Sequence, residues 1–225
     1  IRGVLGDSFP VIGGASAAHS KQRRTFQFCN GLVLTDAVVL LLFAGHVVFS
    51  CGIKGGHAPL GPMEPVTMAK NNVLYRINDK PAVEYFRKYT GNYDLFLNYC
   101  LAVYEKNRDS FYVRSAPSSD ARTGTVTLNG RVPEGAMVQI GTADRKTVIQ
   151  SCNESILRAL ETYPGRRPAA ALFFSCAGRK MIMGTQIVKE VEAIRQHLPD
   201  VPFSGFYCYG EFGPLKKGDP YMFHG

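Results

Sequence analysis

Two short segments near the end of the chain contain side chains that could hold a small molecule. The first reads LFFSCAGR over residues 172–179, an apolar run that ends in a Ser-Cys pair and a small-Gly-Arg turn. Ligands bind at the carboxyl ends of strands in open α/β layers. The guanidinium of Arg179 could hold a carboxylate or phosphate there through paired N–H groups. We therefore predict binding residues at Cys176 and Arg179.

The second segment reads PFSGFYCYGEFGP over residues 202–214. Gly210 and Gly213 flank Glu211 and leave its carboxylate with little steric cover, so it could receive an amino group. Strand alternation places Tyr207 and Tyr209 on one face, where they could form an aromatic wall. The alternative is a bulge and turn that simply end a core strand.

Cys176 allows a second interpretation, a thiol-dependent enzyme. A thiol beside Arg179 gains thiolate character and therefore reactivity. However, no partner base can be identified from the spacing of the five histidines, and a nucleophile needs such a base. The plainest alternative is an inert buried cysteine at a strand end. We expect a protein that is not an enzyme and keep the thiol enzyme as an open alternative.

Cofactor and metal motifs are missing from the sequence. There is no GxGxxG fingerprint and no Gly-Lys dipeptide of a phosphate-binding loop. No two cysteines or histidines have zinc-ligand spacing. We expect neither a cofactor nor a metal.

The composition is that of a globular protein. The 225 residues are 45% hydrophobic and 20% charged, with a formal net charge of +8. The basic residues are thinly spread, which argues against nucleic acid as a partner. The six cysteines include no CxxC pair, so we expect reduced thiols and a cytoplasmic location. The most apolar run, over 38–43, is too short to cross a membrane.

The elements that must position the two segments follow from hydrophobic periodicity. The pattern predicts strands over 169–174 and 201–209 with a helix over 187–198 between them, a β-α-β unit. A further helix is predicted over 146–163. Glu190 is placed on the polar side of its helix, together with Lys189, Glu192 and Arg195.

The remainder of the chain predicts mostly β structure. Asn30-Gly31 is a strong hairpin signal. Apolar runs over 32–43 and 47–53 predict buried strands. Asp79 is expected to cap a short helix that ends at Gly91, and a second helix is expected over 94–104.

The two segments also resemble the signatures of a known family. GFYCYGEFGP over 205–214 is similar to the closing motif of the FIST family, the F-box and intracellular signal transduction proteins. FFSCAGR over 173–179 resembles its second signature, and residues 79–91 resemble the start of its C-terminal half. FPVIGG over 9–14 and FCNG over 28–31 resemble the later part of its N-terminal half, whose front we expect to be missing.

The resemblance implies a sensory or adaptor module. Family members look like small-ligand sensors, with amino acids proposed as ligands, and they occur beside bacterial signalling domains or an F-box. We expect an α+β fold of two lobes, each a mixed β-sheet covered by helices. Residues 1–78 would form the later part of the N-terminal lobe, and residues 79–225 the C-terminal domain.

The preferred mechanism is non-covalent capture of a small polar molecule such as an amino acid. Arg179 would meet its carboxylate, Glu211 its amine, and Tyr207 or Tyr209 would supply the wall. The alternative is a protein-interaction or adaptor module, as in a ubiquitin-ligase-like or signalling assembly. Such a module would hold its partner on loops such as 58–64 or 114–122.

Overall fold

The fold was obtained as a computed structural model. It describes residues 4, 6, 9–16, 18, 24–91, 99–105, 111–214 and 222–224. The chain divides into two compact units, each built from separate stretches of sequence. The first unit comprises residues 1–54, 152–180 and 185–224, and the second comprises residues 55–151, 181–184 and 225.

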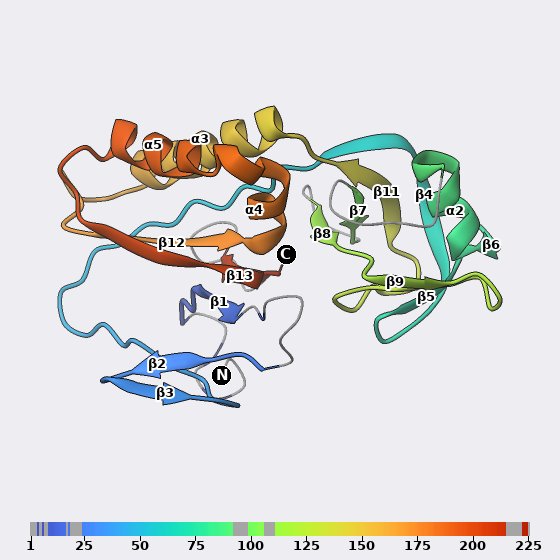
Figure 1. Cartoon of the computed structure of the whole chain (residues 1–225), viewed down its shortest axis with the longest axis horizontal. Helices are drawn as coiled ribbons and strands as arrows, with labels where there is room; N and C mark the ends of the chain where they lie inside the picture. The colour runs from blue at the N-terminus through green and yellow to red at the C-terminus, as the bar shows by residue number, and fades with distance from the viewer. Residues whose placement is uncertain are drawn as a thin grey trace. The chain divides into compact units, whose positions relative to one another are not determined.

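The sheet of the first unit is organised around two parallel strands, β12 (Ala171–Cys176) and β13 (Phe203–Pro214). Their register runs from Ala171 opposite Phe203 to Cys176 opposite Cys208. Strand β13 continues past the end of β12 (Figure 1). There it pairs with two antiparallel strands, β1 (Gly13–Ser16) and β14 (Met222–His224). The carboxyl end of β12 therefore lies beside the middle of β13.

Helices cover one face of this sheet. They are α3 (Arg145–Glu161) and α5 (Val188–His197), and α4 (Ala177–Met183) and the 3-10 turn η1 (Gly184–Gln186) connect β12 to α5. Figure 1 shows these helices on one side of β12 and β13. Apolar side chains of α3 and α5 pack against those of the two strands. This core consists of Cys152, Ile156, Leu160, Ala171, Phe173, Ala193, Ile194, Leu198, Val201 and Phe203. The predicted β-α-β unit is confirmed.

A hairpin lies near the start of the described chain. It consists of β2 (Gln27–Cys29) and β3 (Leu32–Leu34), joined by Asn30 and Gly31. Both turn residues have positive φ, 49° and 79°, as a two-residue turn of this type requires. This prediction is confirmed.

The long buried strands predicted over 32–43 and 47–53 are wrong. Strand β3 ends at Leu34, and no strand follows until Ala58. Leu40 and Leu42 are 67% and 73% exposed. Hydrophobicity alone predicted burial, but among the described residues nothing packs over these side chains.

The second unit contains an eight-stranded sheet of order β8-β7-β11-β4-β5-β10-β9, with β6 paired to β5. Its strand pairs are antiparallel. The strands are β4 (Ala58–Lys70), β5 (Val73–Ile77), β6 (Lys80–Pro81), β7 (Tyr99–Tyr104), β8 (Tyr112–Arg114), β9 (Ser118–Asp120), β10 (Thr125–Thr127) and β11 (Met137–Thr142).

Helix α2 (Ala82–Thr90) packs on this sheet with Val83 and Phe86 buried. It ends at Gly91, which has left-handed backbone geometry, as predicted. Its N-cap is Pro81. Asp79, the expected cap, instead occupies a tight turn with φ 59°. Asn78 and Asp79 both have positive φ, whereas a helix needs negative φ, so the helix begins only after them.

The helix predicted over 94–104 is also wrong where the structure describes it. Residues 94–98 lie outside the described residues, and 99–104 form β7, between β8 and β11. All four residues from Cys100 to Val103 are buried. A short run that is apolar on every side fits a buried strand as well as a helix. The α+β fold class itself is confirmed.

Candidate functional site

Both predicted segments lie in the first unit, on β12 with the start of α4 and on β13. Their polar side chains form two clusters. Residues that follow one another along a strand point to opposite faces of the sheet. Ser175 and Tyr207 are register partners that face the helices, and Cys176 and Cys208 are the next pair. The site therefore has a helix-side cluster and a thiol-side cluster.

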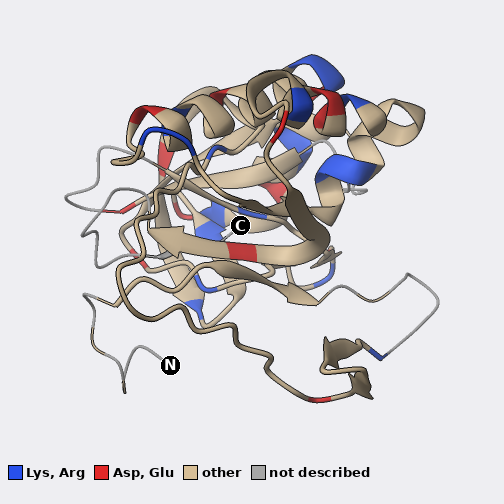
Figure 2. Cartoon of the chain, turned by 90° about the vertical axis from the view of Figure 1, so that its left-hand side faces the viewer, with Lys and Arg blue, Asp and Glu red and all other residues tan. Residues whose placement is uncertain are grey.

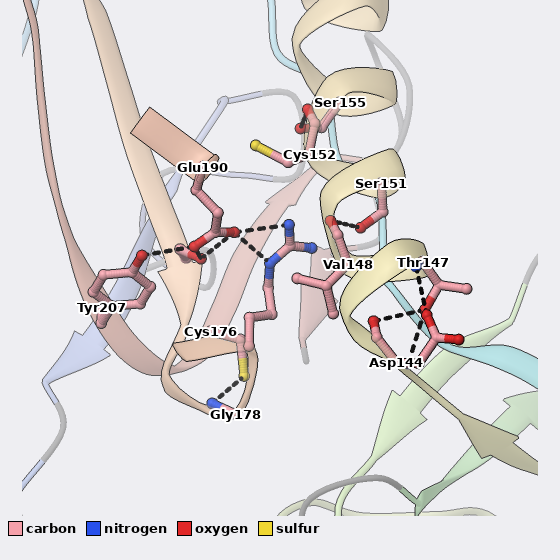
Figure 3. Close-up of polar contacts among 12 residues, drawn as sticks. Asp144, Thr147, Val148, Ser151, Cys152, Ser155, Cys176, Gly178, Glu190 and Tyr207 are labelled. Carbon is pink, nitrogen blue, oxygen red and sulfur yellow. Dashed lines mark hydrogen bonds and ion pairs between the residues drawn. The ribbon is translucent and has the colours of Figure 1, made fainter. Parts of the chain in front are cut away.

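The helix-side cluster is organised around Glu190 of α5, which is 5% exposed. Both Nε and Nη2 of Arg179 lie 2.9 Å from its Oε1. The hydroxyl of Tyr207 donates to Oε2 at 2.6 Å, and Figure 3 shows this ring pointing at the carboxylate. Ser175 Oγ lies 3.3 Å and 3.4 Å from the two oxygens. A buried carboxylate is stable only with such partners, and here it has a cation and two hydroxyl donors.

Tyr207 acts in this cluster as a hydrogen-bond donor. Burial, followed by its hydrogen bond to Glu190, raises the pKa of the phenol well above its usual range. The hydroxyl therefore keeps its proton near neutral pH. Lys180 Nζ lies 5.5 Å from the centre of the same ring, within the range of a cation–π contact.

The thiol-side cluster consists of Cys176, Cys208 and Glu211. Cys208 Sγ donates to Oε1 of Glu211 at 3.2 Å. Cys176 Sγ accepts from the backbone N–H of Gly178 at 3.4 Å (Figure 3). Gly14 of β1 lies opposite Glu211, and a Cβ at this glycine would collide with the Cys208 side chain. Only glycine lets β1 approach this closely.

The electrostatics of this cluster favour neutral groups. Burial is the main reason that the pKa of the Glu211 carboxyl is raised, while the Cys208 thiol and Arg179 act in the opposite direction. Burial and then the charge of Glu211 raise the pKa values of Cys176 and of Cys208. The expected activation of Cys176 by Arg179 is outweighed, because Arg179 lowers that pKa less than burial and Glu211 raise it.

The structure thus brings the predicted residues together in pairs. Arg179 and Tyr207 meet at Glu190, and Cys176 and Glu211 lie on the thiol side. Tyr209, the proposed second wall residue, is 50% exposed. The role of each in holding a ligand stays a prediction.

Sequence reasoning missed Glu190, which was placed on the water-facing side of its helix. A signal was available. Glu190 lies three residues after Ile187 and four before Ile194, so it belongs to the apolar stripe of α5. Cys208 was also left out of the predicted site, although the register of two parallel strands makes it the neighbour of Cys176.

Replacing Glu211 with Gln should stabilise the protein at neutral pH. A carboxyl whose pKa is raised by folding stabilises the folded state below its unfolded pKa and loses that contribution as pH rises through the folded value. Urea unfolding of wild type and Glu211→Gln should therefore give similar stabilities in acid and a more stable variant at neutral pH. Glu161→Gln, an exposed site in the same unit, is the control. Equal stability of wild type and variant at neutral pH would contradict the assignment.

The chain therefore pairs an α+β fold with a strand-end cluster of polar and ionisable side chains, which is an arrangement of ligand-binding domains. It belongs to the FIST family: the FIST N domain matches residues 1–80, and the FIST C domain matches residues 82–214. FIST domains generally act in signal transduction and are thought to bind small ligands.

Relatives occur in bacteria and archaea. Uncharacterized proteins of Mycobacterium bovis and Mycobacterium tuberculosis are each 24% identical over 219 residues, which cover 91% of this chain and 56% of theirs. An uncharacterized protein of Methanocaldococcus jannaschii is 28% identical over 86 residues, 38% of this chain and 17% of its own. The chain thus spans about half the length of the curated relatives that match most of it. No solved structure matches it.

Two further observations concern membranes and metals. In the described part of the chain, no helix has the length and apolar character needed to cross a bilayer. Within the same residues, no three His, Cys, Asp or Glu side chains are grouped as a metal site requires.

Figure 2 shows Lys and Arg segments interrupted by Asp and Glu segments on the helices, so the basic residues do not form one continuous stripe there.

Proposed function

We propose that this chain is the ligand-binding part of a small-molecule sensor, and that its ligand carries an amino group received by Glu211. The observation that carries the proposal is the partly buried carboxyl of Glu211, which lies in β13 just beyond the point where β12 ends. Its hydrogen-bond donor is a neutral thiol, and among the described residues no cation lies within ion-pair distance of it. A desolvated carboxyl of this kind gains most from a cation that arrives with a ligand.

The proposal does not assign Arg179 to the ligand carboxylate, the role that the sequence predicts for it. Its guanidinium is 13% exposed and is bound to Glu190. A ligand carboxylate would have to compete with that internal carboxylate. We therefore assign recognition of the ligand to Glu211 and its amine, and treat Arg179 as a residue that positions the end of β12.

Isothermal titration calorimetry with amino acids and simple primary amines tests the proposal. We expect saturable binding of at least one amine and no binding of the analogue in which hydrogen replaces the amino group. Glu211→Gln removes the charge and should weaken binding about 10- to 100-fold, as expected for a charge-assisted contact worth roughly 1.5–3 kcal/mol. Glu161→Gln should bind like wild type. No heat from any amine with folded protein would exclude this ligand class.

A second candidate function is a protein-interaction or adaptor module. The observation that favours it is the exposed apolar segment from Val38 to Phe49, in which Leu41 and Leu42 are 72% and 73% exposed. Contiguous exposed apolar side chains mark interaction surfaces. A partner held equally by wild type and by Arg179→Ala/Glu211→Ala, but lost on Leu41→Asp/Leu42→Asp, would support this function over ligand sensing.

A further inference from the structure

Two cysteines stand directly opposite each other on neighbouring strands. Cys176 and Cys208 are register partners in the parallel pair β12/β13. Paired strands lie about 4.8 Å apart, and a disulfide joins Cα atoms about 4.4–6.8 Å apart. Register partners point to the same face of a sheet. The two cysteines therefore share the thiol side of the sheet, and the strand spacing falls within the Cα range of a disulfide.

The two sulfurs differ in exposure and in hydrogen bonding, which suits Cys176 to be oxidised first and Cys208 to attack it afterwards. Cys208 is fully buried, and its thiol has two acceptors in reach, Oε1 of Glu211 at 3.2 Å and the carbonyl oxygen of Ser175 at 3.5 Å. Cys176 is partly exposed at the end of β12 and accepts from the N–H of Gly178. Cys176 is the more exposed of the two cysteines, so a dissolved oxidant would meet it first. Glu211 lies nearest to the Cys208 thiol and is the group that would take its proton.

We propose that Cys176 and Cys208 form a reversible disulfide between β12 and β13 that changes the hydrogen bonding of Glu211. In the first step the Cys176 thiol loses its proton and its sulfur attacks one oxygen of a hydroperoxide. The S–O bond forms, the O–O bond breaks, and the proton goes to the departing oxygen, which leaves as water or an alcohol. Cys176 is thereby oxidised to a sulfenic acid. In the second step Cys208 gives its proton to Glu211 and its sulfur attacks that of Cys176. The S–S bond forms, the S–O bond breaks, and the departing hydroxide leaves as water with the proton. A dithiol reductant reverses the cross-link by thiol–disulfide exchange.

The cross-link has a consequence for the proposed amine site, on whose existence this part of the inference rests. In the disulfide Cys208 has no thiol hydrogen, so Oε1 of Glu211 loses the donor that it has in the reduced protein. A ligand amine then meets a carboxyl with one donor fewer. Oxidation is therefore expected to strengthen amine binding.

Peptide mapping of the intact chain tests the cross-link directly. Trypsin gives peptides 167–179 and 196–216, each with a single cysteine, Cys176 and Cys208 respectively. After hydrogen peroxide treatment and alkylation of the remaining thiols, we expect these two peptides as one disulfide-linked species that disappears on reduction. Full alkylation of both peptides would overturn the proposal, as would Cys176 oxidised to sulfinic acid beside alkylated Cys208.

A variant and a second reagent separate this outcome from misfolding. Cys208→Ala should leave Cys176 as a sulfenic acid that dimedone traps, whereas the control Cys29→Ala should still form the linked species. Phenylarsine oxide, which needs two adjacent sulfurs, should protect both peptides from alkylation in untreated wild type, and failure to do so would overturn the proposed proximity. Calorimetry on reduced and oxidised samples then tests the amine site separately. A mapped disulfide without amine binding in either sample would contradict the proposed function and still support the disulfide.

Discussion

Replacing Arg179 with Met should lower the free energy of unfolding by about 3–5 kcal/mol, the usual cost of removing one partner of a buried ion pair. The reason is the carboxylate left behind. Glu190 is 7% exposed at its side chain and would keep Tyr207 and Ser175 as donors but lose its cation. Urea unfolding followed by far-UV circular dichroism measures the loss, because the chain contains no tryptophan.

Two controls make this result specific. Arg167→Met removes the cation of an exposed pair, Arg167–Asp200, whose side chains are 61% and 78% exposed, and should cost less than about 1 kcal/mol. The double variant Arg179→Met/Glu190→Gln removes both buried charges and should recover most of the stability. A loss at Arg179 no larger than that at Arg167 would contradict the importance assigned to the Glu190 cluster.

Replacing Gly205 with Ala should be at least as damaging as ordinary overpacking, which costs about 1–3 kcal/mol. Gly205 of β13 lies opposite Phe173 of β12. A Cβ there would collide with the carbonyl oxygen of Phe173 and lie 2.7 Å from its carbonyl carbon. Both atoms are backbone, so the clash is relieved only by separating the two strands. Urea unfolding of the variant measures the effect.

Gly178→Ala is the matched control, because it makes the same chemical change nearby. Within 4 Å its Cβ would meet only Cys176 Sγ, at 3.4 Å, which is ordinary contact. Gly178 lies in α4, where alanine is favoured over glycine by about 0.5–1 kcal/mol. The two variants should therefore change stability in opposite directions. A neutral or stabilising Gly205→Ala would show that β12 and β13 are not packed as described.

Features that depend on short-range physics were predictable from the sequence. The hairpin at Asn30-Gly31 needs only a turn that tolerates positive φ. Helix α5 follows from apolar residues at helical spacing, and β12 and β13 follow from apolar runs on either side of it. The carboxyl ends of these strands were correctly expected to bring Cys176 and Arg179 near the segment that contains Tyr207.

The spacing within α5 signals that Glu190 is buried, but its pairing with Arg179 could not be predicted, because that pairing depends on contacts between distant parts of the chain. Glu190 is tolerated inside the protein because three partners surround it: Ser175 of β12, Tyr207 of β13 and Arg179 of α4. Its spacing from Ile187 and Ile194 does not say which cation or hydroxyl groups it meets. Likewise, the apolar run after Leu34 reports what the side chains prefer and not whether anything covers them.

The alternation of Ser175 with Cys176, and of Tyr207 with Cys208, fixes how the two parallel strands are aligned. Sliding β12 by a single residue would turn the Ser175 hydroxyl away from Glu190 and bring the Cys176 sulfur to that face. Misalignment is therefore penalised on both sides of the sheet at once. The contacts within the chain therefore favour the correct register of β12 and β13 even without a ligand.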